Sequence, residues 1–116
     1  MEFDKGLVGG STIMLVLSLL NEKDMYGYEI IRELDFRSNH AFQFKEGTLY
    51  PVLHRCENQG YVKSYRKEAE NGKVRKYYAI TTEGARQLDR ERGQWRAFAV
   101  SVEQIIGGNA YVGCEA

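Results

Sequence analysis

The chain has 116 residues, of which 43% are hydrophobic and 28% are charged, and its formal net charge is zero. This composition indicates a single folded globular domain and excludes a disordered chain. The longest apolar run, residues 13–20, is too short to cross a bilayer, and no signal-peptide pattern is present. Two cysteines, Cys56 and Cys114, give no disulfide framework. We therefore expect a cytoplasmic protein with no membrane partner.

The first part of the chain predicts two helices that build a core. Residues 7–20 are apolar on nearly every side, which indicates a buried central helix. In residues 25–38 the apolar side chains recur at helical spacing, with charged side chains between them. This second segment therefore predicts an amphipathic helix, and an aromatic-rich loop follows it.

A third helix is predicted from about Thr48 to Gln59, and it contains Pro51, the only proline in the chain. With Thr48 as the N-cap, Pro51 would be the third helical residue and would remove no intrahelical hydrogen bond. Gly60 would provide a left-handed C-cap. One face of this helix is apolar and should pack inward, including Cys56 as a small buried hydrophobe. The residues predicted to face outward are Gly47, Tyr50, Pro51, His54 and Asn58, with Thr48 and Arg55 at the margin.

A basic β-hairpin is predicted next. Residues 61–70 and 73–81 are β-prone runs joined by Asn71-Gly72, which is a strong hairpin signal. Residues 61–79 hold six basic and two acidic side chains, a net charge of +4, so this segment carries the positive field. Tyr77 and Tyr78 should point to opposite faces, one into the core and the other toward a bound phosphate. The basic residues are Lys63, Arg66, Lys67, Lys73, Arg75 and Lys76.

The last predicted helix carries an apolar stripe. The sequence Thr-Thr-Glu-Gly at 81–84 predicts its N-terminal cap, and large apolar residues then recur at intervals of seven, three, four and three. Such a stripe is too apolar to remain in water, so we expect residues 81–107 to form a dimerisation helix, followed by a flexible tail at 108–116. The stripe consists of Leu88, Trp95, Phe98, Val102 and Ile105.

The predicted order of three helices and a basic hairpin is that of a winged helix-turn-helix. We therefore predict a mainly α fold with a β-hairpin wing, in which residues 1–80 form a DNA-binding domain. The third helix would enter the major groove of a double-stranded DNA operator, and the wing would neutralise backbone phosphates. The candidate DNA contacts are Thr48, Tyr50, Pro51, His54, Arg55, Lys67, Lys73, Arg75, Lys76 and Tyr77.

Three stretches of the chain resemble the signature of PadR-type transcriptional regulators. They are MYGYEII at 25–31, EGTLYPVLHRCENQGYV at 46–62 and RKYYAITTEG at 75–84, and they occur in the family's order and spacing. The resemblance implies a homodimeric winged-helix repressor that responds to a small aromatic effector. Because a single helix follows the wing, the chain is similar to the short subfamily. That similarity places Trp95, with Phe98 beside it, about where a drug-stacking tryptophan lies in this subfamily.

Several alternatives stay open on the sequence alone. The basic hairpin could protect a sheet edge from aggregation, or it could bind an acidic protein partner instead of DNA. Trp95 could be dimer core rather than a ligand platform, and Cys56 could be thiol-sensitive rather than inert. Catalysis has little support, because the two histidines, His40 and His54, belong to no cluster with metal-ligand spacing and no phosphate-binding loop is present. We expect no enzyme activity, no cofactor and no metal.

Overall fold

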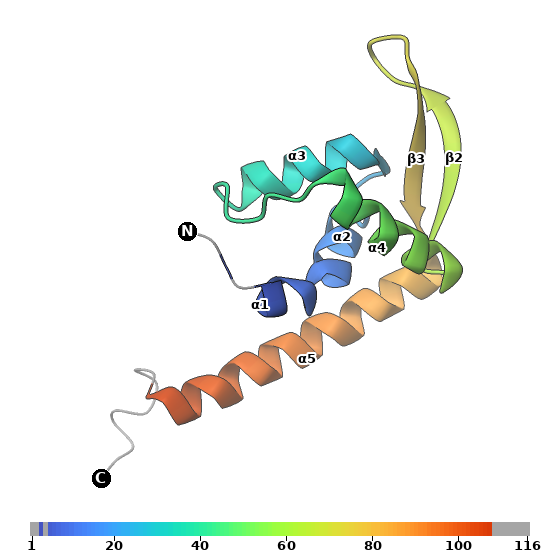
Figure 1. Cartoon of the computed structure of the whole chain (residues 1–116). Coiled ribbons are helices and arrows are strands. Elements are labelled where there is room, and N and C mark those ends of the chain that lie inside the picture. Colours follow the sequence, from blue (N-terminus) through green and yellow to red (C-terminus); the bar gives the residue numbers. More distant parts are fainter. Residues whose placement is uncertain (1–2, 4, 108–116) are drawn as a thin grey trace.

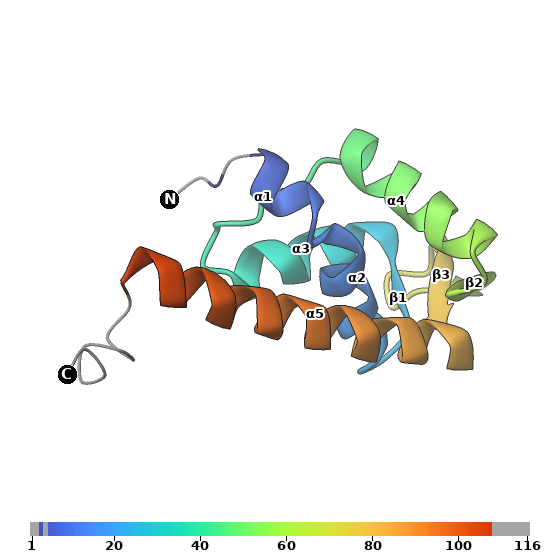
Figure 2. The same cartoon turned by 90° about the horizontal axis from the view of Figure 1, so that it is seen from below.

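The computed structural model describes residue 3 and residues 5–107, so the predicted tail and Cys114 lie outside the described residues. Within this part the chain forms helices packed beside a small antiparallel sheet, with one long helix running beneath them (Figures 1 and 2). The predicted mainly α fold with a β-hairpin wing is confirmed. The elements are α1 (Lys5–Gly9), α2 (Thr12–Leu20), β1 (Met25–Tyr26), α3 (Gly27–Arg37), α4 (Glu46–Asn58), β2 (Val62–Glu68), β3 (Val74–Ile80) and α5 (Thr82–Ile106).

The first predicted helix is divided into two, so the prediction of one helix over residues 7–20 was wrong. The break falls at Gly10 and Ser11, two residues that are weak helix formers. Both the backbone N–H of Ser11 and the hydroxyl of Thr12 donate to the carbonyl of Val8, each at 2.9 Å. The second piece, α2, is the buried centre that the sequence predicted, and its Leu17 is fully buried.

A short third strand, β1, precedes α3 and was not predicted. It pairs antiparallel with β3 through Met25 opposite Tyr78 and Tyr26 opposite Tyr77, which gives the strand order β1-β3-β2. Two residues are too few to produce a period-2 pattern in the sequence. The pairing places the start of α3 directly beside the base of the wing, which is the hairpin formed by β2, β3 and residues 69–73.

Helix α4 begins earlier than the sequence indicated. Its N-cap is Lys45 rather than Thr48, and the N–H of Leu49 donates to the carbonyl of Lys45 at 2.9 Å. Pro51 is therefore the sixth helical residue, and it cannot donate the bond that the carbonyl of Gly47 would normally accept. The predicted inner face is confirmed, because Leu49, Val52, Leu53 and Cys56 are all buried. Gly60 ends the helix with a φ of +80°, as predicted.

The wing extends well away from the helices (Figure 1). Its register runs from Val62 opposite Ile80 to Glu68 opposite Val74. At the tip, the N–H of Ala69 donates to the carbonyl of Lys73 at 2.8 Å, and Gly72 has a φ of +82°. The predicted hairpin is thus correct. Its loop, however, consists of the three residues 70–72, with Gly72 in the left-handed position, rather than Asn71-Gly72 alone.

Helix α5 is joined firmly to the winged-helix body at its N-terminus. Thr81 is its N-cap, as predicted: its Oγ1 accepts from the N–H of Gly84 at 3.0 Å and donates to the carbonyl of Gly60 at 2.6 Å. The N–H of Thr81 also donates to the carbonyl of Tyr61 at 3.0 Å. One residue therefore ties α5 to the junction between α4 and β2.

The prediction that Leu88 belongs to the dimerisation stripe was wrong. Leu88 is only 1% exposed and packs in the core of its own subunit, because the first half of α5 lies along α2 (Figure 2). The second half of α5 continues past the body of the protein (Figure 1). The stripe that remains available for another molecule therefore begins at Trp95.

Candidate nucleic-acid interface

The outer face of α4 offers polar groups and one compact apolar surface to solvent. Thr48, Pro51, His54 and Arg55 are all exposed, as the helical wheel predicted. The apolar face of the same helix is buried in the core, so these four side chains are held on a rigid element. Side chains at this position on the second helix of a helix-turn-helix can reach base edges in a major groove.

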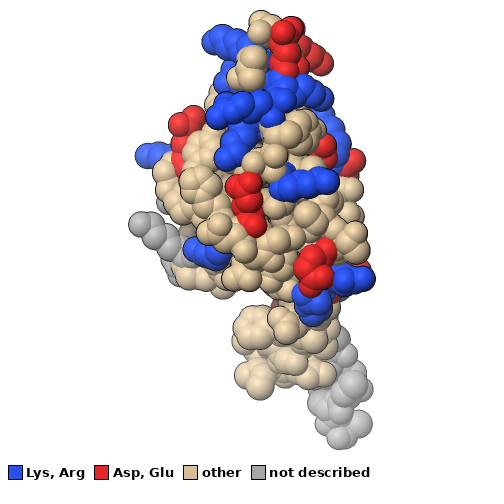
Figure 3. All heavy atoms as spheres, turned by 90° about the vertical axis from the view of Figure 1, so that its right-hand side faces the viewer, with Lys and Arg blue, Asp and Glu red and all other residues tan. Residues whose placement is uncertain are grey.

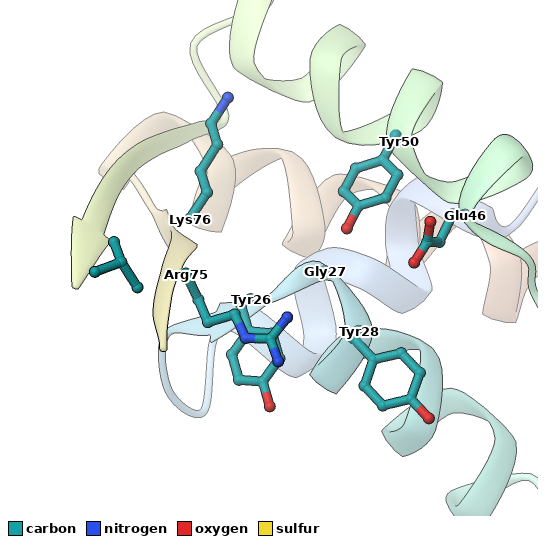
Figure 4. Close-up of a pocket in the computed structure, with 8 residues that line it drawn as sticks. Tyr26, Gly27, Tyr28, Glu46, Tyr50, Arg75 and Lys76 are labelled. Carbon is teal, nitrogen blue, oxygen red and sulfur yellow. The ribbon is translucent and has the colours of Figure 1, made fainter. Parts of the chain in front are cut away.

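Tyr50 departs from the outward orientation that the sequence predicted. Its side chain is half-buried and packs toward the start of α3, where Gly27 leaves room for the phenol ring (Figure 4). Burial, together with the Glu46 carboxylate, raises the pKa of Tyr50 above its ordinary value. Tyr50 therefore connects α4 to α3 instead of projecting freely into solvent.

Basic side chains gather on one side of the molecule, over the wing (Figure 3). Lys67 and Lys73 are exposed, whereas Arg75, which pairs with Lys67 near the tip, and the next residue, Lys76, are partly buried. The Nζ of Lys76 lies 4.0 Å from an oxygen of Glu57, so this cation is partly neutralised within the subunit. A hairpin with exposed cations beside an outward-facing polar helix suits a polyanionic surface.

A group of aromatic rings holds the wing in place. Tyr65 and Tyr77 stack with their centroids 5.8 Å apart, and Tyr26 meets Tyr77 edge-on at 5.4 Å. The Tyr65 hydroxyl donates to the carboxylate of Asp24, and that bond raises the pKa of Tyr65 to about 12. Tyr77 is 8% exposed and supports the ammonium group of Lys67, which lies 4.6 Å from its centroid.

The sequence assigned only one of the two neighbouring tyrosines to the core, but Tyr77 and Tyr78 are both buried. The structure therefore places Tyr77, a predicted DNA contact, inside the aromatic group and away from an open DNA-facing surface. Its position indicates a supporting role, in which it orients Lys67 and the wing.

A recess of about 410 Å³ lies where α3, α4 and the wing meet (Figure 4). The guanidinium carbon of Arg75 lies 5.2 Å from the centroid of the Tyr26 ring, and the Arg75 Nε is buried without a hydrogen-bond partner in the described part of the chain. Sequence reasoning missed Tyr26 and Tyr28 at this site, because only the β1–β3 pairing brings them to Arg75. The residues that line the recess are Tyr26, Gly27, Tyr28, Glu46, Tyr50, Val74, Arg75 and Lys76.

The second half of α5 exposes the remaining apolar stripe. Trp95 is 52% exposed, Phe98 66% and Ile105 85%, while Val102 is half-buried. Trp95 and Phe98 also border a hollow of about 570 Å³ that reaches Met14 in α2 and Gly10 in the break between α1 and α2. The polar lining of this hollow comes from α5, namely Gln87, Glu91 and Gln94.

The helices α3 and α4 pack their apolar faces into the core, the outer face of α4 is polar, and a cationic hairpin follows them. This arrangement defines a winged helix-turn-helix protein. The model of the PadR-like family of transcriptional regulators matches residues 16–90, which is most of the chain. The protein belongs to this family, and its predicted family resemblance is confirmed. Family membership makes it a transcriptional regulator and implies that it binds DNA.

Individual relatives agree with this assignment. The chain is 39% identical over 100 residues to an uncharacterised protein of Lysinibacillus sphaericus, covering 86% of this chain and 88% of that one. It is 30% identical to a transcriptional regulator of Mycobacterium tuberculosis, over 78% of each chain. The solved structure of a transcriptional regulator from Clostridium thermocellum superposes with a TM-score of 0.81 at 32% identity, covering 88% of this chain and 99% of that one. None of the helices in the described residues is long and apolar enough to cross a membrane.

Proposed function

We propose that the protein is a homodimeric repressor that binds an operator through α4 and the wing, and that a small aromatic effector releases it. One observation carries the DNA-binding part: α4, whose outer polar side chains are exposed, packs against β2 of the wing, and the wing carries exposed cations. In this arrangement His54, Arg55, Thr48 and Pro51 would meet base edges or sugars. Lys67, Lys73 and Arg75 would meet phosphates.

The exposed half of α5 supports the dimer. Trp95, Phe98 and Ile105 are large apolar side chains with more than half of their surface in water, and they lie on one face of a helix. Burying each would contribute about 1.5–3 kcal/mol to association. A second copy packed on this stripe would hold two α4 helices about one DNA turn apart, about 34–36 Å.

The hollow beside Trp95 supports an effector site. It offers an indole and the ring of Phe98 for stacking, and a dimer partner packed on α5 would cover its open side. A ligand there can release DNA only if it binds one arrangement of the two subunits better than the other. Titrating planar aromatic compounds while recording the fluorescence of Trp95, the sole tryptophan, tests this part of the proposal.

The experiment for the DNA-binding part is a gel shift with the DNA upstream of the protein's own gene, repeated over a range of salt concentrations. We expect nanomolar-range binding that weakens steeply as salt rises, because phosphate contacts release counterions. Two outcomes would favour the alternative that the wing binds a protein. One is a DNA affinity that does not change with salt concentration, and the other is no DNA binding together with binding of an acidic protein. The same assay with an unrelated duplex measures the specificity ratio.

A further inference from the structure

The recess at the junction of α3, α4 and the wing brings together groups that suit an anion. Arg75 reaches it from β3, Tyr28 from the first turn of α3, and Tyr50 from α4 (Figure 4). We propose that this recess binds a single phosphodiester group of the DNA backbone and thereby sets the position of α4 in the groove. This inference rests on the proposed DNA-binding function and adds a particular site and ligand to it.

Arg75 is the cation best placed to hold the phosphodiester. No ion pair involves its guanidinium within the described residues, and its Nε is buried without a hydrogen-bond partner. Stacking over Tyr26 orients the guanidinium, and because the Nε is buried, a phosphate would be bound through the two Nη groups. An arginine held in this way can form two parallel hydrogen bonds to a phosphate, which a mobile lysine at the wing tip cannot.

The charge of the recess fits a monoanion. Arg75 and Lys76 contribute two positive charges, and the carboxylate of Glu46 contributes one negative charge. The remaining excess of one positive charge matches a phosphodiester, whereas a dianionic free phosphate would be opposed by Glu46. Lys76 is also drawn toward Glu57, 4.0 Å away, which weakens its share in the site.

Neutral donors complete the site. The N-cap of α3 is Tyr26, whose side chain makes no capping hydrogen bond, so the first N–H groups of this eleven-residue helix are not capped by it. Gly27 lines the recess but is itself buried, because the Tyr50 ring occupies the space beside it. The hydroxyl of Tyr50 points toward Gly27 and adds a donor within the lining, whereas Tyr28 contributes its ring (Figure 4).

An NMR titration of the full-length protein with the dinucleotide d(TpT), which carries one phosphodiester, tests the site without an operator. We expect the amide signals of Gly27 and Tyr28 to shift and saturate at millimolar concentration. The uncharged methylphosphonate analogue should leave them in place. Arg75→Gln should weaken d(TpT) binding at least fivefold and Tyr50→Phe, which removes the hydroxyl but keeps the ring, about twofold to fivefold. The matched control Arg66→Gln, on an exposed wing cation outside the recess, should change nothing.

The outcomes separate this inference from the proposed function. Wild-type protein that binds duplex DNA but shows no d(TpT) shifts at Gly27 and Tyr28 would overturn the recess while leaving DNA binding intact. Equal effects of Arg75→Gln and Arg66→Gln would overturn it as well. Inorganic phosphate binding more tightly than d(TpT) would identify a free-phosphate site and also refute the proposal. Saturable d(TpT) shifts in a protein that binds no duplex would support the recess and contradict the proposed function.

Discussion

The phenol ring of Tyr50 lies so close to the backbone of Gly27 that a Cβ on residue 27 would stand 2.5 Å from the tyrosine hydroxyl oxygen. The glycine therefore lets α4 and α3 approach each other, and the ring forms one wall of the recess beside Arg75. Gly27 and Tyr50 belong to separate signature stretches of the sequence, but the Tyr50 ring fits only because residue 27 has no side chain.

Replacing Gly27 with alanine should push the Tyr50 ring away from α3. We expect a loss of unfolding free energy of about 1–2 kcal/mol, since the crowded ring must move, together with weaker DNA binding. Urea denaturation and a gel shift measure the two effects. Gly47→Ala is the matched control, because a Cβ at Gly47 meets nothing within 4 Å and stability should stay the same or rise by up to about 1 kcal/mol. Equal behaviour of the two variants would contradict the contact.

His54 is exposed on the outer face of α4 and should read base edges. His54→Ala should reduce operator affinity by about 1–3 kcal/mol while leaving affinity for unrelated DNA and the thermal stability unchanged. Asn58→Ala, one turn beyond His54 and at the last residue of the same helix, is the comparison and should have a smaller effect, because base contacts concentrate toward the N-terminal end of such a helix. A His54 variant that retains full operator preference would show that α4 docks differently.

The wing cations should act through charge alone. Lys67→Gln combined with Lys73→Gln should weaken binding to all duplexes about equally, and the slope of log affinity against log salt should fall by up to about two units. The reason is that each lost phosphate contact releases about one counterion fewer. The pair Arg86→Gln and Arg90→Gln removes the same charge from exposed positions on α5 and should leave the slope unaltered. A slope that stays constant in the wing variant would mean that the wing does not touch phosphate.

The exposed stripe of α5 should hold the dimer together. Phe98→Glu places a charge at its centre, and we expect light scattering to report a monomer. Val100 is 58% exposed but lies on roughly the opposite side of the helix, so Val100→Glu should remain dimeric. In the wild type, dilution to the monomer should shift Trp95 emission to longer wavelength as the indole returns to water. A dimeric Phe98→Glu variant would place the interface elsewhere.

Cys56 should make stability fall at alkaline pH. Burial raises the pKa of its thiol to about 11, from an ordinary value of about 9. Between these values the unfolded thiol loses its proton while the folded one keeps it, so the native state binds more protons and unfolding becomes easier as pH rises. The expected slope is up to about 1.4 kcal/mol per pH unit. Denaturation from pH 8 to 11 measures it, and Cys56→Ala, which cannot titrate, should lack this part of the slope.

The features that the sequence predicted well are those set by periodicity within one element. The inner face of α4 follows from helical spacing, and the hairpin follows from two β-prone runs around Gly72. Leu88 was misassigned because spacing shows that Leu88 and Trp95 share a stripe, but not where along α5 the subunit's own core ends.

The recess could not be predicted, because it depends on distances between elements. Tyr28, Tyr50 and Arg75 come from three elements, and the two-residue strand β1 that aligns them leaves no sequence pattern. Tyr50 was read as outward-facing because a helical wheel treats the helix alone. Its long side chain in fact bends onto the neighbouring helix α3, where glycine leaves space.

The bonds of Thr81 to Gly60, Tyr61 and Gly84 attach the N-terminal end of α5 rigidly to the C-terminal end of α4. With 25 residues, α5 is about 37 Å long. If α5 rotates by about 5° around its C-terminal end, its N-terminal end moves sideways by about 3 Å and carries α4 with it. This displacement is close to the rise of one base pair, about 3.4 Å. In the proposed dimer, a small change in the angle between the two α5 helices would therefore shift each α4 by about one base pair along the DNA.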